Sequence, residues 1–165
     1  MSGRVEWVLT ALEREGVRYL VVGGVAVVLH GHLRTTLDLD LVLQLERSNL
    51  ERALRAFAEL GLQPQVPVSL ESFADPKNRE IWLREKNMTV FSLWHPDHPG
   101  FAVDLFVREP FEFDAVYRRA LRVPLRGVQA TVVSREDLME MKRATGRAHD
   151  LQDVAALSEL AEEAT

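Results

Sequence analysis

Residues 17–43 read VRYLVVGGVAVVLHGHLRTTLDLDLVL, and this stretch decides the fold. It begins with a short apolar and β-branched run that ends at the glycine pair Gly23-Gly24, a pattern typical of a buried strand. The alternation that starts at Leu37 predicts a second strand. Between the two strands there is room for one short helix. The expected elements are a strand over 17–22, a helix over 25–32 and a strand over 37–43.

The remaining sequence predicts more strands and then more helices. Ser48 and Glu51 have the spacing of a capping box, which would open a helix, and Ser134 with Asp137 resembles another cap. The expected helices are 4–15, 49–60, 111–121, 135–146 and 149–163. The expected strands are a pair within 81–94, one strand over 101–107 and a hairpin over 122–133, with 63–77 as a loop that could contain a helical turn. This order predicts an α+β (α/β-like) fold, a mixed sheet flanked by helices with helices at the C-terminus.

Composition limits the kind of protein. A chain of 165 residues with 47% hydrophobic content suits a single domain over 1–165, with a core at about 17–133 and a C-terminal helical segment at about 134–165. A net charge of -5 argues against an extended nucleic-acid-binding surface. The absence of cysteine excludes disulfides and thiolate zinc sites. No apolar stretch is long enough for a bilayer and no signal peptide precedes the domain, so we expect a cytoplasmic protein without membrane partners.

Three aspartates lie within apolar strand sequences. Asp38 and Asp40 are two residues apart, so their side chains share one face of the strand. Asp104 stands alone in the apolar run 101–107, which could pair with the strand over 37–43. Carboxylates that gather on one face repel each other unless a cation lies between them. Such a group suits Mg²⁺ or Mn²⁺, although an edge strand with both carboxylates facing water would explain Asp38 and Asp40 equally simply.

The glycine pair and the residues before the second strand could bind phosphate. Gly23 and Gly24 would let a phosphate approach the backbone at the start of a helix. Arg34, Thr35 and Thr36 add a cation and two hydroxyls close to the aspartates. A simple turn and a surface arginine are the alternative interpretations.

Histidine and aromatic residues give weaker signals. The histidines form two close pairs that lack the spacing of zinc motifs, which makes zinc binding an unfavoured reading. These pairs are His30 with His32 and His95 with His98. Four aromatic residues interleave with apolar residues at strand spacing, and we expect them in the core rather than in a base-stacking platform. They are Trp82, Phe91, Trp94 and Phe101.

The run GGVAVVLHGHLRTTLDLDLVL resembles the core motif of the polymerase-β-type nucleotidyltransferase superfamily: a glycine pair, a spacer and D-x-D, with Asp104 as the third carboxylate. The variant with R-T-T-x-D-L-D is most similar to the AbiEii/AbiGii-type branch of toxin–antitoxin and phage-defence systems. Residues 138–142 (LMEMK) and 146–153 (GRAHDLQD) resemble the lysine motif and the R-x-x-D-x-x-D motif of that branch.

The resemblance implies roles for residues of the tail. Lys142 would contact nucleotide phosphates, with Arg147 nearby, and Asp150 would help to order the site. The alternative for Arg147 is a pair with Asp150 or Asp153 that orients the last helix. The implied catalytic set is Asp38, Asp40, Asp104, Lys142 and Asp150, with the first three as ligands of Mg²⁺ or Mn²⁺.

The expected function is a magnesium-dependent transfer of a nucleoside monophosphate from an NTP to a hydroxyl on a protein, an RNA or a small molecule. A toxin–antitoxin or defence system is the implied setting. The family often has serine where this chain has Gly24, and the chain lacks the extra helical domain of longer members. Acceptor choice is therefore open, and a toxin or antitoxin partner could complete the site. The alternatives are a non-catalytic binding or antitoxin module and a structural α+β domain with incidental aspartates.

Overall fold

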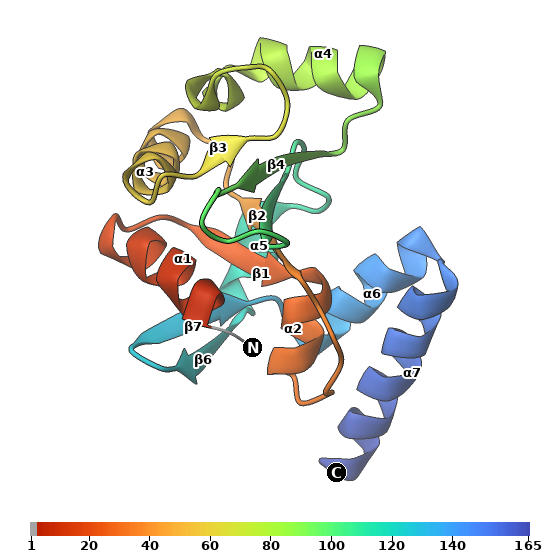
Figure 1. The fold of residues 1–165 in the computed structure, drawn as a ribbon. Helices are drawn as coiled ribbons and strands as arrows, with labels where there is room; N and C mark the ends of the chain where they lie inside the picture. The colour runs from red at the N-terminus through yellow and green to blue at the C-terminus, as the bar shows by residue number, and fades with distance from the viewer. Residues whose placement is uncertain (1–2) are drawn as a thin grey trace.

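The computed structural model describes residues 3–165, in which seven strands form one mixed sheet of order β3-β4-β5-β2-β1-β7-β6 (Figure 1). The strands are β1 (Tyr19–Val22), β2 (Asp38–Leu43), β3 (Gln63–Pro64), β4 (Val90–Trp94), β5 (Ala102–Phe106), β6 (Leu121–Leu125) and β7 (Val128–Val132). The helices are α1 (Gly3–Arg14), α2 (Gly23–Leu29), α3 (Arg47–Glu59), α4 (Pro76–Lys86), α5 (Phe113–Arg118), α6 (Arg135–Thr145) and α7 (Ala148–Glu163), with a 3-10 turn, η1 (Leu70–Ala74).

Strand β2 lies in the middle of the sheet, antiparallel to β1 and parallel to β5. Its alternate residues Leu39 and Leu41 are fully buried, so one face of β2 belongs to the core. Figure 1 shows α1 and α3 on one side of the sheet, and α2 with the pair α6 and α7 on the other. The predicted α+β class, with a mixed sheet and C-terminal helices, is confirmed.

Local sequence explains several boundaries. Ser134 caps α6, because its Oγ accepts a hydrogen bond of 3.1 Å from the backbone N–H of Asp137. Gly146 ends the same helix in a left-handed conformation (φ 63°). Strands β6 and β7 form the predicted hairpin, which turns at Gly127. These predictions from caps and glycines are confirmed.

Two predictions were wrong. The segment 81–94 is not a strand pair, because α4 occupies its first part. Asp75 accepts a hydrogen bond from the backbone N–H of Lys77 and Pro76 fills the first turn, while Asn87 ends the helix in a left-handed conformation. Strand β4 follows alone.

The capping box at Ser48 is the second wrong prediction. Helix α3 begins at Arg47 after Glu46, so Ser48 is already inside its first turn and donates a hydrogen bond to the Glu46 carboxylate. Glu51 pairs with Arg47 instead of reaching back to a cap.

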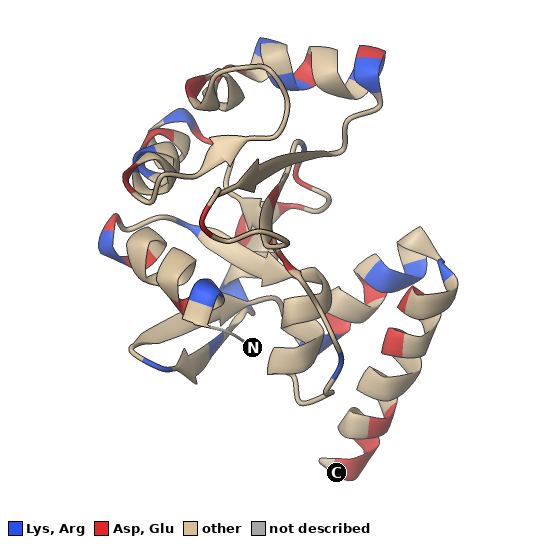
Figure 2. Ribbon diagram, viewed as in Figure 1, with Lys and Arg blue, Asp and Glu red and all other residues tan. Residues whose placement is uncertain are grey.

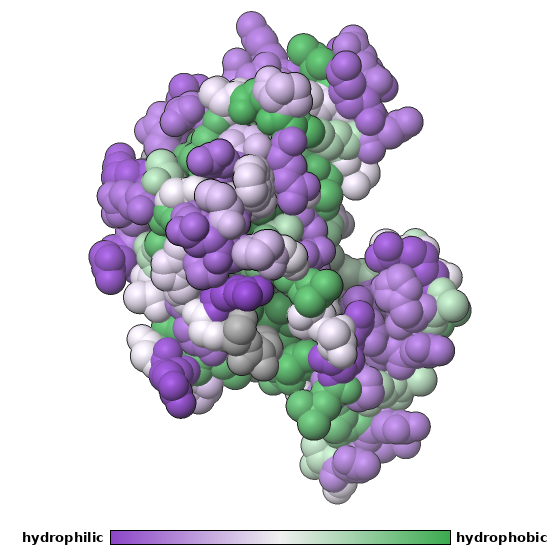
Figure 3. All heavy atoms as spheres, in the orientation of Figure 1, coloured by the Kyte–Doolittle hydropathy of each residue, from purple (hydrophilic) through white to green (hydrophobic). Residues whose placement is uncertain are grey.

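The surface carries both signs of charge, and Figure 2 shows Lys and Arg interspersed with Asp and Glu along α3 and α4. Over residues 3–165 the helices include none with the length and apolar character required to cross a bilayer. Figure 3 shows the molecule hollowed between the part that carries α4 and the helices α6 and α7.

Candidate active site

Asp40 and Asp104 lie directly opposite each other on the parallel strands β2 and β5. Partners in register project to the same face of a sheet, so the two carboxylates face each other across the ladder. Asp38 is two residues before Asp40 and shares that face, opposite Ala102. The structure therefore brings the three predicted aspartates together on the face that α1 and α3 do not cover.

The carboxylates are electrostatically crowded. Burial raises the pKa of Asp40 to about 7, and the negative charges of Asp104 and Asp38 add to this rise. The positive charge of Lys142 opposes it. Burial and the charge of Asp104 also raise the pKa of Asp38. A cation placed among these groups would relieve the repulsion that raises both pKa values.

Ser92, which no local sequence pattern identifies, orients the third carboxylate. It lies on β4 in register with Asp104, and its Oγ donates a 2.6 Å hydrogen bond to Asp104 Oδ1. The hydrogen bond leaves the second oxygen of Asp104 free to contact Asp40 or a ligand. Only the pairing of β4 with β5 puts the two side chains together.

The glycine pair gives the site its close packing. Gly23 has a φ of 68°, and a Cβ built there would lie 2.1 Å from Asp40 Oδ2. A Cβ at Gly24 would lie 2.7 Å from Thr36 Oγ1. Both glycines therefore make room for side chains of this chain. This is a reason for their presence that is independent of any phosphate.

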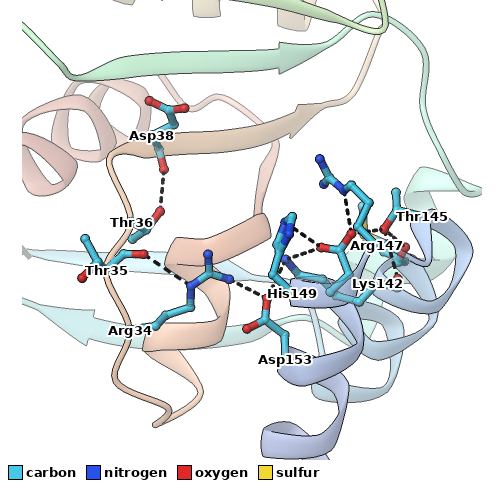
Figure 4. A network of polar contacts seen from close by, with 11 residues as sticks. Arg34, Thr35, Thr36, Asp38, Lys142, Thr145, Arg147, His149 and Asp153 are labelled. Carbon is cyan, nitrogen blue, oxygen red and sulfur yellow. Dashed lines mark hydrogen bonds and ion pairs between the residues drawn. The ribbon is translucent and has the colours of Figure 1, made fainter.

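The segment before β2 lies beside the turn. Thr36 Oγ1 donates to the backbone oxygen of Asp38 at 3.4 Å, and Arg34 Nε donates to the backbone oxygen of Thr35 at 3.4 Å (Figure 4). Arg34, Thr35 and Thr36 line a cavity of about 490 Å³ together with Val28 and Leu33. The cavity places a guanidinium and two threonines next to the glycine turn.

One ion pair binds the C-terminal helices to this segment, and a second joins the two helices to each other. Asp153 of α7 accepts a hydrogen bond from Arg34 Nη1 and also pairs with Lys142 Nζ of α6 at 3.0 Å (Figure 4). Both Asp153 and Lys142 are buried. One carboxylate thus connects the loop before β2 to both helices.

Asp150 is a second partner of the Lys142 ammonium group. Its Oδ1 lies 3.3 Å from Lys142 Nζ, while Thr145 Oγ1 and Arg147 Nε donate to its Oδ2 at 2.9 and 2.8 Å. Burial alone would raise the pKa of Asp150, but the hydrogen bonds from Arg147 and Thr145 and the charge of Lys142 hold it at about 2.

These contacts bear on the residues predicted from the tail motifs. Lys142 is turned toward Asp150 and Asp153, although its charge still reaches Asp40. Arg147 makes the pair with Asp150 that the alternative interpretation described. Asp153, which received no role in the predicted site, is the residue that connects the loop to the helices.

The aromatic and histidine predictions have mixed outcomes. Trp82, Phe91 and Phe101 are buried as expected, but Trp94 at the end of β4 is 39% exposed. The prediction was wrong for Trp94 because its face of β4 is the one that carries Ser92, away from the core. His30 Nε2 lies 2.8 Å from the backbone oxygen of Val133, which accounts for that ring without a ligand.

The carboxylate pair fits a divalent ion only in part. Within the described part of the chain, residues 3–165, no three His, Cys, Asp or Glu side chains are already arranged around one ion position. Asp40 and Asp104 supply hard oxygen donors on facing strands, and their mutual repulsion favours a cation. This donor set fits Mg²⁺, which usually keeps several water or phosphate ligands in addition to one or two carboxylates.

Two antibiotic adenylyltransferases of known structure share this fold. A lincosamide antibiotic adenylyltransferase, LnuA, in its lincomycin-bound crystal structure, has the same fold with a TM-score of 0.65 and 14% identity, covering 97% of this chain and 98% of that one. ANT(2")-Ia in complex with adenylyl-2"-tobramycin is similar with a TM-score of 0.60 and 13% identity over 93% of this chain and 84% of that one.

The chain belongs to the family described as "Nucleotidyltransferase of unknown function (DUF6036)", whose match covers residues 6–163. No curated protein matches the chain in sequence. The predicted nucleotidyltransferase class of enzyme is confirmed by this family, while the AbiEii/AbiGii-type branch stays a prediction.

Proposed function

We propose that the chain, as a single domain, transfers a nucleoside monophosphate from an NTP to a hydroxyl group in a magnesium-dependent reaction. The observation that carries this proposal is the register of β2 and β5, which sets Asp40 opposite Asp104 with Asp38 on the same face. Charge neutralisation and positioning account for most of the catalysis in phosphoryl-type transfer.

The three aspartates have two proposed tasks, binding the ion and accepting a proton. Asp40 and Asp104 would hold the ion, with the charge of Asp38 nearby on the same face, and the positive charge of the ion would be shared with the triphosphate. Asp104, fixed by Ser92, would accept the proton of the acceptor hydroxyl. The new bond then joins the acceptor oxygen to the α-phosphorus, and the bond from the α-phosphorus to the bridging oxygen breaks, which releases pyrophosphate.

The nucleotide would lie beside the carboxylates, in the cavity next to the glycine turn. Thr35 and Thr36 line the cavity beside the glycine turn, where Arg34 adds positive charge. Arg34 is also paired with Asp153, so a triphosphate would have to compete with or share that carboxylate. Lys142 would act on the phosphates through its charge while Asp150 and Asp153 hold its side chain.

The test is pyrophosphate release from ATP, CTP, GTP and UTP with Mg²⁺ and a broad set of acceptors. Asp40→Asn should abolish pyrophosphate release. The matched control is Asp97→Asn, which removes an exposed carboxylate outside the sheet and should leave the rate unchanged. NTP binding without pyrophosphate release in any mixture would contradict the proposal.

That last outcome would support a second candidate, a nucleotide-binding module without catalysis that acts as an antitoxin or regulator. The observation that favours this candidate is that the predicted phosphate-binding cations, Arg34 and Lys142, are both paired with carboxylates of the chain. Growth arrest on expression of the wild-type chain, relieved by Asp40→Asn, would support instead a toxin role like that of the AbiEii/AbiGii-type branch.

A further inference from the structure

A second cavity, of about 620 Å³, opens on the β4 and β5 side of the carboxylates and shares no lining residue with the cavity beside Arg34. Its volume is within the range of small-molecule sites. Asp38 and Asp104 form part of its wall, so a molecule in it would touch the proposed catalytic carboxylates. The other lining residues that matter here are Gln65, Ser92, Trp94, His98 and Phe101.

The aromatic wall of this cavity is fixed by the fold. Trp94 pairs through its backbone with Ala102 of β5 and with Gln63 of β3, which leaves its indole on the face that carries Ser92 and Asp104. The next residues form a tight turn, in which the backbone N–H of His98 donates to His95 at 3.1 Å. The backbone N–H of Phe101 in turn donates to the oxygen of His98 at 3.3 Å.

The ring of His98 is held in place by two neighbouring rings. It packs against Trp7 of α1 with ring centroids 4.9 Å apart and against His95 at 5.2 Å. A side chain held in this way is ready to contact a ligand with little further loss of conformational freedom.

The charge of the cavity limits what can enter. Its lining contains two carboxylates and no lysine or arginine. Apart from an ion held by the aspartates, which the triphosphate of the NTP already shares, the lining offers no cation to a phosphate group on the acceptor, and burying such a phosphate without a partner is costly. Amino groups would be attracted by the carboxylates and by the aromatic faces.

We infer that this cavity binds the acceptor, and that the acceptor is a small, ring-shaped polyhydroxy compound, neutral or amino-substituted, that carries no phosphate. The inference rests on the proposed function. The apolar face of such a ring would lie on the indole of Trp94, which is exposed, while its hydroxyls would donate to Gln65 and Asp104. Nucleic-acid ends are disfavoured because each carries phosphates into the cavity.

Matched acceptors test the charge requirement. Labelled NTP and Mg²⁺ are incubated with glucose, glucosamine, myo-inositol, glucose 6-phosphate and an RNA oligonucleotide with a free 3′ hydroxyl. We expect glucosamine and the neutral rings to be labelled, and kcat/KM for glucose 6-phosphate to be at least tenfold below that for glucose. Labelling of only the RNA or only the phosphorylated sugar would overturn the inference. The inference would also fail if the protein binds NTP but labels none of the ring compounds.

Variants separate the acceptor site from the nucleotide site. Trp94→Ala should raise KM for the ring acceptor about tenfold and leave NTP binding, measured by calorimetry, within twofold of wild type. Trp94→Phe should restore most of the loss. Ile81→Ala is the control, because Ile81 on α4 is equally exposed at 39% but lies outside the cavity. An unchanged acceptor KM in Trp94→Ala would refute the assignment of this cavity to the acceptor. If the wild-type protein does not bind NTP at all, the proposed function itself is refuted.

Discussion

Replacing Asp40 by asparagine should stabilise the ligand-free protein at neutral and alkaline pH. The folded-state pKa of about 7 lies above the ordinary value of 3.8, because the carboxylate is buried beside Asp104 and Asp38. Between these pH values the folded chain keeps a proton that the unfolded chain has released. The stability that Asp40 supplies is therefore complete below about pH 4 and is lost as the pH rises to about 7.

The size of the effect follows from the difference in pKa. At about 1.4 kcal/mol for each unit, the loss is at most about 4 kcal/mol above pH 7, and roughly 3 kcal/mol of it develops between pH 5 and pH 8. An asparagine does not ionise and its amide can donate to Asp104. Asp40→Asn should therefore remove this pH dependence.

Urea unfolding at pH 5 and pH 8, followed by tryptophan fluorescence, measures the difference. Asp97→Asn is the control for the change in net charge. A clear loss of stability in Asp40→Asn at pH 8 would refute the reasoning and identify Asp40 as a structural, hydrogen-bonded aspartate. Stabilisation by NTP with Mg²⁺ should also vanish in the variant, because a ligand stabilises only the fold that binds it.

Three further substitutions test the geometry. Gly23→Ala should destabilise the protein more than Gly16→Ala in urea unfolding. Both glycines have a φ near 67°, but only at Gly23 would the new Cβ meet another side chain, that of Asp40. Equal losses of stability would exclude this close approach. Asp153→Asn should cost about 3 kcal/mol by leaving a buried lysine with one partner, and a loss below about 1 kcal/mol would contradict the contact. Asp150→Asn should cost about 2 kcal/mol of stability at pH 7. The lowered pKa of about 2 makes Asp150 stabilise the fold above its ordinary pKa of 3.8, and this stability disappears as the pH falls toward 2. A loss of the same size at pH 2 would show that charge is not the cause.

The central part of the fold could be predicted because its signals are local. The alternation around Asp38 and Asp40 fixes their common face, and the apolar run around Asp104 marks a strand. Glycines and caps fixed the hairpin and α6. Helix α4 differs from the predicted strand although Asp75 and Pro76 have the pattern of a helix start, because its apolar residues Ile81, Trp82 and Leu83 are adjacent and show no helical period.

The rest depends on pairings between distant parts of the chain. Ser92 reaches Asp104 only because β4 pairs with β5 in one particular register. Arg34 and Asp153 are 119 residues apart, and no local pattern connects them. Trp94 could be assigned to the core or to the open face only once the partner strands were known.

The arrangement of Asp40 and Asp104 has a consequence for how such proteins diverge. The separation of the two carboxylates is determined by the spacing between hydrogen-bonded strands, about 4.8 Å in any sheet, and not by the particular side chains packed beneath them. Core residues on the opposite face, such as Leu39 and Leu41, can therefore be exchanged for others of similar volume while the distance between the two carboxylates persists. Proteins that keep only 13 or 14% of their residues in common with this chain can accordingly keep the same backbone frame.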